Sequence, residues 1–382
     1  MVAGEAVWGS ATSGDARLVV VGMRWSRTLL AVAPVVMLVG CRQLFGIDES
    51  RALLPGPTDA AAEAGPVVDG ESPFTVHHAV PSGETLHGIW GAGPDFFVAV
   101  GSSSLTFVSN GGALTRLGGT QTGRDYLAVW GFSRTDIFAV GETAAHGGFI
   151  DHFDGTGWTS VYDAPTPLLG VWGTRAGGGT VIAVGSKGQI FGRKTGEAWR
   201  SFDKLSKGPA DPDEPDTPRL WGISGRSLDD FSVAADSRFY HYEPDAGGLA
   251  FYEPTTQTNT LVRSVWQAPG DSTSVYFGTN FYGLLWFSAE GSPTQGYPGA
   301  VLFRDEETPG AEKSFIQGVW GTEQKIVAVG DHGRIYVYDT GLATPSAVPS
   351  PTDEPLAAVW GSSIDDVWIV GRREIILHGS VR

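Results

Sequence analysis

His87-Gly88-Ile89-Trp90-Gly91 is followed about ten residues later by Val100-Gly101, and this pair of motifs recurs along the chain. The first motif returns around six further tryptophans: Trp130, Trp172, Trp221, Trp266, Trp320 and Trp360. The second motif returns, with small variations, at Val140-Gly141, Val184-Gly185, Val233-Ala234, Phe277-Gly278, Val329-Gly330 and Val370-Gly371. Successive tryptophans stand 40 to 54 residues apart, close to the length of one four-stranded propeller blade. The chain therefore contains seven repeats of blade length, which excludes solenoids built from short repeats.

Each repeat contains short segments of alternating, β-branched or aromatic residues, which predict β-strands. In the second repeat we expect four strands, at Leu127–Trp130, Asp136–Val140, Gly148–Phe153 and Trp158–Tyr162. Because a blade is covered on both faces by its neighbours, it needs large apolar side chains at regular positions. We therefore expect the seven repeated tryptophans to be core residues rather than a ring on which a ligand stacks.

The two ends of the repeat region complement each other. The seventh repeat has three predicted strands, within 356–360, 366–370 and 374–378, and lacks a fourth. The segment Phe74–Val80, ahead of the first repeat, has the character of a fourth strand without a blade. Docked on the last sheet, it would close the ring and cover an exposed sheet edge. We therefore predict an all-β fold over residues 73–382: a seven-bladed β-propeller of four-stranded antiparallel blades, with the last blade closed by an N-terminal strand.

A secretory signal precedes the repeats. Arginines stand ahead of an apolar stretch, Thr28–Val39, that ends in Leu38-Val39-Gly40-Cys41. This stretch is too short to cross a bilayer, which needs about 20 residues. We interpret residues 23–40 as a signal peptide and residues 1–22, which place acidic groups before it, as an upstream extension ahead of a translation start at Met23.

The motif ending at Cys41 resembles the lipobox of bacterial lipoproteins. That resemblance implies cleavage before Cys41 and acylation of its thiol and then of its amine, so that the lipid chains hold the protein on a membrane. The chain has one cysteine, so no disulfide is expected. Residues 41–72, rich in Ala, Pro and Gly, are expected to form a flexible tether. Arg42 rather than an aspartate follows the cysteine, which favours the outer membrane of the cell envelope, and leaves its periplasmic and surface faces both open.

The repeats resemble the Trp-Gly and Asp-box propellers, which include bacterial neuraminidase-type repeat proteins and the photosystem assembly factor propellers. The likeness rests on the spacing of the predicted strands and on one turn, Asp154-Gly155-Thr156-Gly157-Trp158, which is similar to a partial Asp-box. His152 stands where the box has a serine. The resemblance implies a propeller fold and leaves the activity open, since one fold serves many functions.

The composition is that of a folded protein with an acidic surface. Hydrophobic residues make up 41% of the chain, and the formal net charge is −16. Such a surface repels nucleic acid. The partners we expect are the membrane, through the lipid anchor, and a protein or glycan bound on a propeller rim or in the central channel.

No catalytic motif is found in the sequence. Sialidases of similar architecture need an arginine triad, a tyrosine nucleophile with a glutamate, and an acidic aspartate, and this set cannot be assigned here. The arginines and tyrosines considered for it are Arg124, Tyr126, Arg263, Tyr276 and Tyr282. We therefore assign no catalytic and no cofactor-binding residues, and the lipidation site Cys41 is the single site residue that we name.

No metal site is predicted either. His77 and His78 are adjacent, and neighbouring residues of a strand point to opposite faces of the sheet. The acidic run Asp211–Asp216 lacks the alternating ligands and the glycine of a calcium loop.

Two classes of function remain. The first is a non-catalytic binding or scaffold module in the cell envelope; the alternative is a polysaccharide hydrolase or lyase whose catalytic groups converge from several blades. The longest repeats carry the extra segments Lys204–Pro218 and Gly291–Ser314. Both lead into the first strand of the next repeat, so we expect them to emerge on one rim, and we hypothesise that this rim faces the partner.

Overall fold

The computed structural model of the chain describes residues 70–117, 122–201, 218–236, 239–243, 248–252, 261–268, 274–280, 283–288, 299–303, 315–340, 342 and 345–382. The expected signal segment, Cys41 and all but the last three residues of the expected tether lie outside these residues. Among the described residues, no helix is long and apolar enough to cross a membrane.

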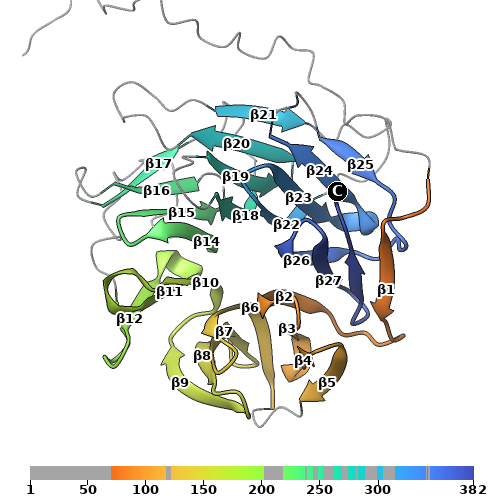
Figure 1. The fold of residues 1–382 in the computed structure, drawn as a ribbon. Helices are drawn as coiled ribbons and strands as arrows, with labels where there is room; N and C mark the ends of the chain where they lie inside the picture. The colour runs from red at the N-terminus through yellow and green to blue at the C-terminus, as the bar shows by residue number, and fades with distance from the viewer. Residues whose placement is uncertain are drawn as a thin grey trace, which may run out of the picture. The chain divides into compact units, whose positions relative to one another are not determined.

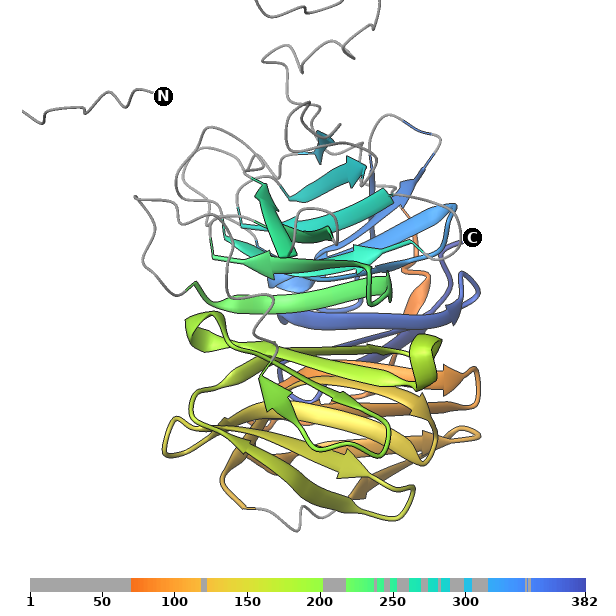
Figure 2. The same cartoon turned by 90° about the vertical axis from the view of Figure 1, so that its left-hand side faces the viewer.

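Seven four-stranded antiparallel sheets are arranged in a ring (Figure 1). Six of these blades use consecutive strands, β2–β5, β6–β9, β10–β13, β14–β17, β18–β21 and β22–β25. The seventh blade has the order β1-β28-β27-β26. Neighbouring blades lie face to face, as Figure 2 shows from the side. The predicted all-β, seven-bladed propeller of four-stranded blades is confirmed.

The strands of blades one to three are β2 (Leu86–Gly93), β3 (Phe96–Gly101), β4 (Thr106–Asn110), β5 (Ala113–Leu117), β6 (Arg124–Ser133), β7 (Asp136–Thr143), β8 (Gly148–Phe153), β9 (Trp158–Ala164), β10 (Leu168–Thr174), β11 (Thr180–Gly185), β12 (Ile190–Lys194) and β13 (Arg200–Ser201). Those of blades four and five are β14 (Leu220–Ser227), β15 (Asp230–Ala235), β16 (Phe239–Glu243), β17 (Gly248–Tyr252), β18 (Val262–Gln267), β19 (Ser274–Thr279), β20 (Leu284–Ser288) and β21 (Gly299–Phe303). Those of blades six and seven are β22 (Ile316–Gly321), β23 (Lys325–Gly330), β24 (Ile335–Asp339), β25 (Ser346–Val348), β26 (Leu356–Ser363), β27 (Asp366–Gly371), β28 (Ile376–Gly379) and β1 (Phe74–His78). Short 3-10 turns are η1 (Ser102–Ser104), η2 (Ala176–Gly178), η3 (Ser186–Gly188) and η5 (Asp331–Gly333).

The seventh blade contains strands from both ends of the repeat region. β1 pairs antiparallel with β28, and Phe74 lies opposite Gly379. Phe74 is buried among the apolar residues of blades six and seven, so the N-terminal strand is held by packing as well as by hydrogen bonds. The strand ends at His78, two residues earlier than expected from the sequence.

The first strand of every blade has the same bulged register. A bulge separates a buried anchor residue from a small residue two positions later. We call the residue between them the bulge position, and the next three the small, aliphatic and tryptophan positions. In blade one these are Leu86 (anchor), His87 (bulge), Gly88 (small), Ile89 (aliphatic) and Trp90 (tryptophan).

The repeat register assigned to blade four from the sequence was wrong. Ser224 pairs with Ser232 as Trp130 pairs with Phe138, so Ser224 occupies the tryptophan position. Trp221 lies three residues earlier, at the bulge position. The sequence Leu220-Trp221-Gly222 matches the repeated motif by composition, and the pairing of β14 with β15 is needed to show the offset.

The second motif was also shifted by one residue in blades four and five. Ala235 pairs with the anchor Leu220, and Thr279 pairs with the anchor Val262, whereas Gly101 has this place in blade one. Part of the extra segment proposed between Gly291 and Ser314 is regular structure as well, because β21 is the fourth strand of blade five. The other extra segment, apart from Pro218, lies outside the described residues.

The Trp-Gly dipeptide packs one blade on the next. A Cβ atom on Gly173 would lie 2.6 Å from the ring of Trp130, and one on Gly361 would lie 2.6 Å from Trp320. Gly131 meets Trp90, and Gly91 meets Trp360, in the same way. Each of these tryptophans therefore covers the glycine of the following blade, and a side chain in place of the glycine would displace it. Six of the seven repeated tryptophans pack against the apolar clusters between blades, as expected for core residues, whereas the expectation was wrong for Trp221, which lines the central channel.

Candidate functional site

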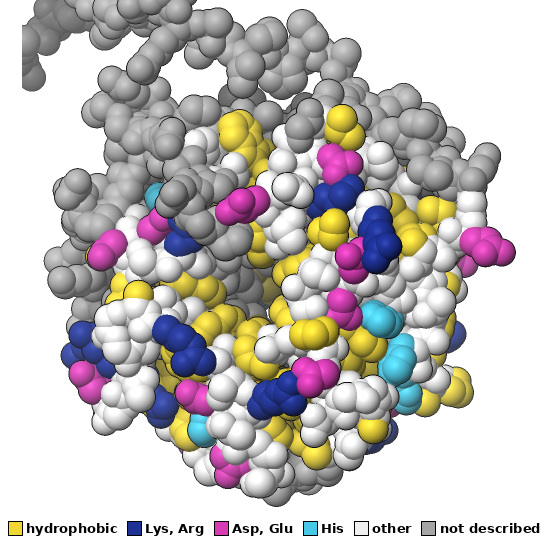
Figure 3. Space-filling model, viewed as in Figure 1, with side chains coloured by type: hydrophobic (Ala, Val, Ile, Leu, Met, Phe, Trp, Pro, Cys, Tyr) yellow, Lys and Arg dark blue, Asp and Glu magenta, His cyan; other side chains and the backbone are white. Residues whose placement is uncertain are grey.

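The first strands of the seven blades surround a central channel that contains two hollows. One, of about 540 Å³, is lined by the bulge, small and aliphatic positions, and we call it the bulge mouth. The other, of about 1070 Å³, is lined by the aliphatic and tryptophan positions, and we call it the tryptophan mouth. The two hollows share aliphatic residues, including Ile89, Val129 and Val171. Figure 3 shows one face of the ring, hollowed at its centre and with hydrophobic side chains around the hollow.

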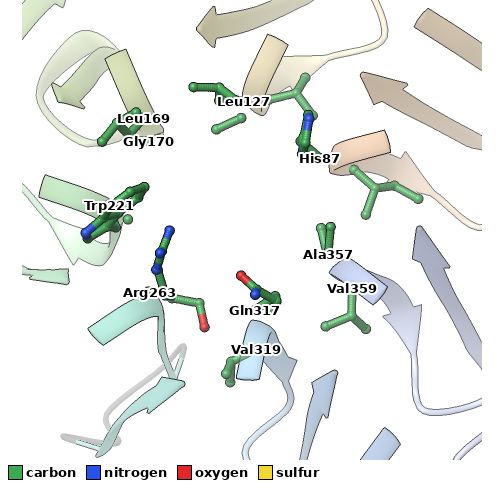
Figure 4. Close-up of a pocket in the computed structure, with 18 of the residues that line it drawn as sticks. His87, Leu127, Leu169, Gly170, Trp221, Arg263, Gln317, Val319, Ala357 and Val359 are labelled. Atoms are coloured by element: carbon green, nitrogen blue, oxygen red, sulfur yellow. The ribbon is translucent and has the colours of Figure 1, made fainter. Parts of the chain in front are cut away.

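The bulge mouth has one residue from each blade at its bulge position, and all seven are half-buried: His87, Leu127, Leu169, Trp221, Arg263, Gln317 and Ala357. Figure 4 shows them around the open centre, with Arg263 extending into it. They come from equivalent places in seven strands because each strand has the same bulge, which turns an extra side chain toward the channel. A hollow of this volume is in the range of small-molecule and peptide sites.

Trp221 and Arg263 form the most distinctive pair in the bulge mouth. The guanidinium carbon of Arg263 lies 3.8 Å from the centre of a Trp221 ring, a close cation–π contact. A hydrogen bond fixes the position of the indole, because Trp221 Nε1 donates to Asp236 at 2.8 Å. Asp236 also accepts a hydrogen bond of 3.0 Å from the backbone N–H of Arg219. Blade four thus provides a fixed aromatic platform for a cation from blade five.

Arg263 has hydrogen-bond donors that are not used within the described protein. Its Nε is buried and has no hydrogen-bond partner among the described residues. Burial lowers the pKa of Arg263, whereas the charges of Asp236 and Asp331 raise it and that of Arg219 lowers it. Among the described residues neither acid forms an ion pair with the guanidinium, so Arg263 is a partly desolvated cation that lines the channel.

Three of the seven bulge residues are polar: Arg263 and Gln317 come from neighbouring blades, and His87 comes from blade one. Gln317 Nε2 donates a hydrogen bond of 3.3 Å to Asp331, the first residue of η5. His87, on blade one, has its pKa lowered by burial, against the opposing charge of Asp125. Blades two and three contribute Leu127 and Leu169 at the bulge position. The opening therefore has polar residues from blades five and six on one side and an apolar side formed by blades two and three, with His87 of blade one beside Leu127.

The other arginine and tyrosine residues considered for a sialidase-like site lie elsewhere. Arg124 and Tyr126 are buried in blade two, where both contact Asp151, with a Tyr126 hydrogen bond of 2.8 Å. Tyr276 packs against Tyr338, and burial raises the pKa of Tyr276 to about 12. Tyr282 lies outside the described residues. The structure therefore does not bring Arg124, Tyr126 or Tyr276 to Arg263.

The adjacent histidines of β1 have different neighbours. The His77 ring lies 5.0 Å from that of Trp368 in blade seven, and the His78 ring lies 4.9 Å from that of Phe107 in blade one. Within the described ranges, no three His, Cys, Asp or Glu side chains are grouped so that they could hold a metal ion. The acidic run 211–216 and Cys41 lie outside those ranges.

Asp154, the acid of the partial Asp-box, has a local role in the turn between β8 and β9. Its carboxylate accepts hydrogen bonds from the backbone and hydroxyl of Thr156, at 2.8 and 2.7 Å, and from Gly157 N at 3.0 Å. These bonds lower the pKa of Asp154 to about 2. The turn is therefore a structural feature of blade two.

Sequence reasoning named the central channel as one possible binding place but did not identify the residues of the bulge mouth. Arg263 and Trp221 were considered for other reasons, and His87, Leu127, Leu169, Gln317 and Ala357 were not considered as a group. The sequence does contain a pattern that could have identified these residues. In six blades the bulge residue stands three places before the repeated tryptophan, and its identity varies from blade to blade although the residues beside it are similar. Blade four, in which Trp221 stands three places before Ser224, follows the same spacing once its register is known.

No protein-family model matches the chain, and no curated protein is similar enough to count as a relative. Solved structures do match it as folds. A YCF48 structure with a bound D1 peptide is 12% identical, with a TM-score of 0.59, over 83% of this chain and 99% of that one. The Cps50 (Swd1) β-propeller domain of Myceliophteria thermophila is 11% identical, with a TM-score of 0.60, over 80% and 99%. Streptogramin B lyase is 13% identical, with a TM-score of 0.60, over 80% and 96%. At such low identity these likenesses show that the chain has a propeller fold.

Proposed function

We propose that the protein is a non-catalytic binding module that takes a segment of a protein partner into its bulge mouth. The proposal rests on one observation: the bulge position varies from blade to blade, whereas the positions beside it in the same strand do not. The anchor, small and aliphatic positions hold similar residues in all seven blades, whereas the bulge position holds His, Leu, Trp, Arg, Gln and Ala. Positions that serve packing repeat with the blades, so a position that differs in nearly every blade is free to serve recognition.

A binding role agrees better with the bulge mouth than the alternative polysaccharide hydrolase does. Glycoside hydrolysis usually employs a pair of carboxyl groups about 5 to 10 Å apart. Among the described residues that line the bulge mouth, Asp331 is the one carboxylate. A propeller of this fold class has been seen with a bound peptide, which makes a protein segment the first ligand to test.

We further propose that the propeller is displayed in the cell envelope by lipid attached at Cys41, on the side of the outer membrane. Support comes from the lipobox-like motif Leu38-Val39-Gly40-Cys41. Membrane fractionation of the native protein and of Cys41→Ser tests the anchor: the native protein should sediment with membranes and the variant should not. A variant that stays in the membrane would contradict lipid anchoring. Protease treatment of intact cells then distinguishes a surface location from a periplasmic one.

The binding proposal is tested by selecting random twelve-residue peptides on the full chain. The selected peptides are then measured on a variant with His87→Ala, Leu169→Ala and Gln317→Ala, three changes confined to the bulge position. We expect the variant to keep its thermal transition and to lose most of the binding. A matched variant with Ser362→Ala and Ser363→Ala, at the tryptophan mouth, should bind as the native protein does. Peptides that bind both variants equally well would contradict the proposal.

A further inference from the structure

The bulge mouth contains a charge that the described protein does not neutralise by contact. Arg124 in blade two shows what a buried arginine normally has, since its guanidinium is paired with Asp151 and bonded to Ser160 at 3.2 Å. Arg263 has an aromatic platform but neither an ion pair nor a hydrogen bond from its guanidinium among the described residues. A guanidinium that has lost part of its hydration is unfavourable until an anion or another acceptor completes it.

We propose that Arg263, stacked on Trp221, binds a carboxylate group of a peptide ligand in the bulge mouth. This inference rests on the proposed peptide-binding function and names the chemical group that the site recognises. The guanidinium presents donors in a planar fork that matches the two oxygens of a carboxylate. The stack on Trp221 holds the fork in one plane, so that less freedom is lost when the ligand binds.

The surrounding charges favour a carboxylate over a more highly charged anion. Asp236 and Asp331 lie near enough to act on Arg263 electrostatically, although neither contacts it. Arg219 is a second cation near Arg263, so two arginines and two acids roughly balance one another around the site, and a single added negative charge is tolerated better than the double charge of a phosphate. The formal net charge of −16 adds to this preference at longer range.

The apolar side of the same opening favours a peptide as the source of the carboxylate. Leu127 and Leu169 line the mouth together with Arg263 and offer contact to an apolar side chain next to the charged group. A peptide provides this combination in two ways, as a chain end with an apolar last residue or as an Asp or Glu beside apolar residues. Both sources share the carboxylate, and the experiment separates them.

The test uses fluorescein-labelled, leucine-rich hexapeptides and the full chain. One peptide has a free C-terminal carboxylate, the second has a C-terminal amide, the third has the amide and an internal Glu, and the fourth has the amide and Gln in its place. Affinities are measured by fluorescence anisotropy on the native protein and on Arg263→Gln, Arg263→Lys and Arg193→Gln. Arg193 is the matched control, because it also stacks on a tryptophan, at 5.5 Å from Trp199, without lining either mouth.

We expect the native protein to bind at least one carboxylate-bearing peptide at least tenfold more tightly than its neutral counterpart. Loss with the C-terminal amide identifies a chain end, and loss on Glu-to-Gln exchange identifies a side chain. Arg263→Gln should remove the difference, Arg263→Lys should restore part of it, and Arg193→Gln should leave it unchanged.

Equal binding of charged and neutral peptides to the native protein would overturn the carboxylate site while leaving peptide binding intact. An equal loss in Arg193→Gln and Arg263→Gln would overturn it as well, because the effect would not come from the mouth. Competition by inorganic phosphate that is stronger than competition by acetate would show a general anion site instead. If no peptide bound the native protein, the proposed function would fail together with the carboxylate site.

Discussion

The two mouths of the channel are built from the same seven strands but have opposite patterns of side chains. At the tryptophan mouth, six of the seven equivalent positions hold tryptophan. Four of these indoles pack against the glycine of the following blade. At the bulge mouth, three residues away along each strand, the seven positions hold six different residue types. Side chains that pack blade on blade meet similar neighbours in most blades and therefore repeat. Side chains that face the opening have no such neighbour and are free to differ.

Blade four is the one described blade without a tryptophan at the tryptophan position. Its tryptophan position holds Ser224, whose hydroxyl accepts a hydrogen bond of 3.0 Å from the backbone N–H of Gln267. Gln267 stands where the next blade would have its glycine, and its side chain bonds to Asp230. Where the tryptophan is absent the glycine is absent too, so the two residues are required together.

The comparison predicts the largest effect for Trp130→Ala. Trp130 packs between blades two and three, so its removal should lower the free energy of unfolding by about 3 kcal/mol. Leu127→Ala, three residues earlier at the bulge mouth, should cost less than about 1 kcal/mol. Urea unfolding of the two variants measures the difference. Equal losses would show that the bulge residue contributes to packing as much as the tryptophan does.

A somewhat smaller effect is expected for Gly173→Ala. The new Cβ would lie 2.6 Å from the Trp130 ring and from the carbonyl oxygen of Thr180, which overpacks the interface by about 1–3 kcal/mol. Gly157→Ala is the matched control, because a Cβ there meets nothing within 4 Å. Thermal melts of both variants test this pair, and a control that is as unstable as Gly173→Ala would contradict the packing role of the Trp-Gly dipeptide.

Arg263→Gln should lower the free energy of unfolding by about 1 kcal/mol or less, because it removes the cation–π contact with Trp221 but no described ion pair. Its main effect should appear in ligand binding. The same urea titration measures the change in stability, and a larger loss would place Arg263 with the packing residues rather than the recognition residues.

The smallest effect is expected for Asp154→Asn, at an exposed turn away from both mouths. The folded-state pKa of Asp154 is about 2, below its ordinary value of 3.8, so its carboxylate stabilises the fold above about pH 4 and this contribution disappears as the pH falls toward 2. Melting temperatures between pH 5 and pH 2 should show a native advantage over the variant that shrinks toward pH 2. A pH-independent difference would mean that the ionised carboxylate is not what stabilises the turn.

Some of this organisation was predictable from local sequence. The strands of blade two were expected at 127–130, 136–140, 148–153 and 158–162, and lie at Arg124–Ser133, Asp136–Thr143, Gly148–Phe153 and Trp158–Ala164. The errors in register fall in blades four and five. There Ala235 and Thr279 stand where blade one has Gly101, and Trp221 lies three residues before the position that holds tryptophan in the other blades. A bulge shifts the strand alternation by one residue, and its place is determined by pairing, which composition does not show.

The sequence by itself determined the all-β architecture, the number of blades and their strand order, because each blade is a local unit whose tryptophan, glycines and alternating residues recur within about 50 residues. It also contains the lipobox-like motif at Cys41, which stays a prediction. Only the tertiary structure decided which side chains share the bulge mouth and which tryptophan belongs to it. Those seven residues come from seven different repeats, and they meet only because the blades, once packed on one another, surround a common channel.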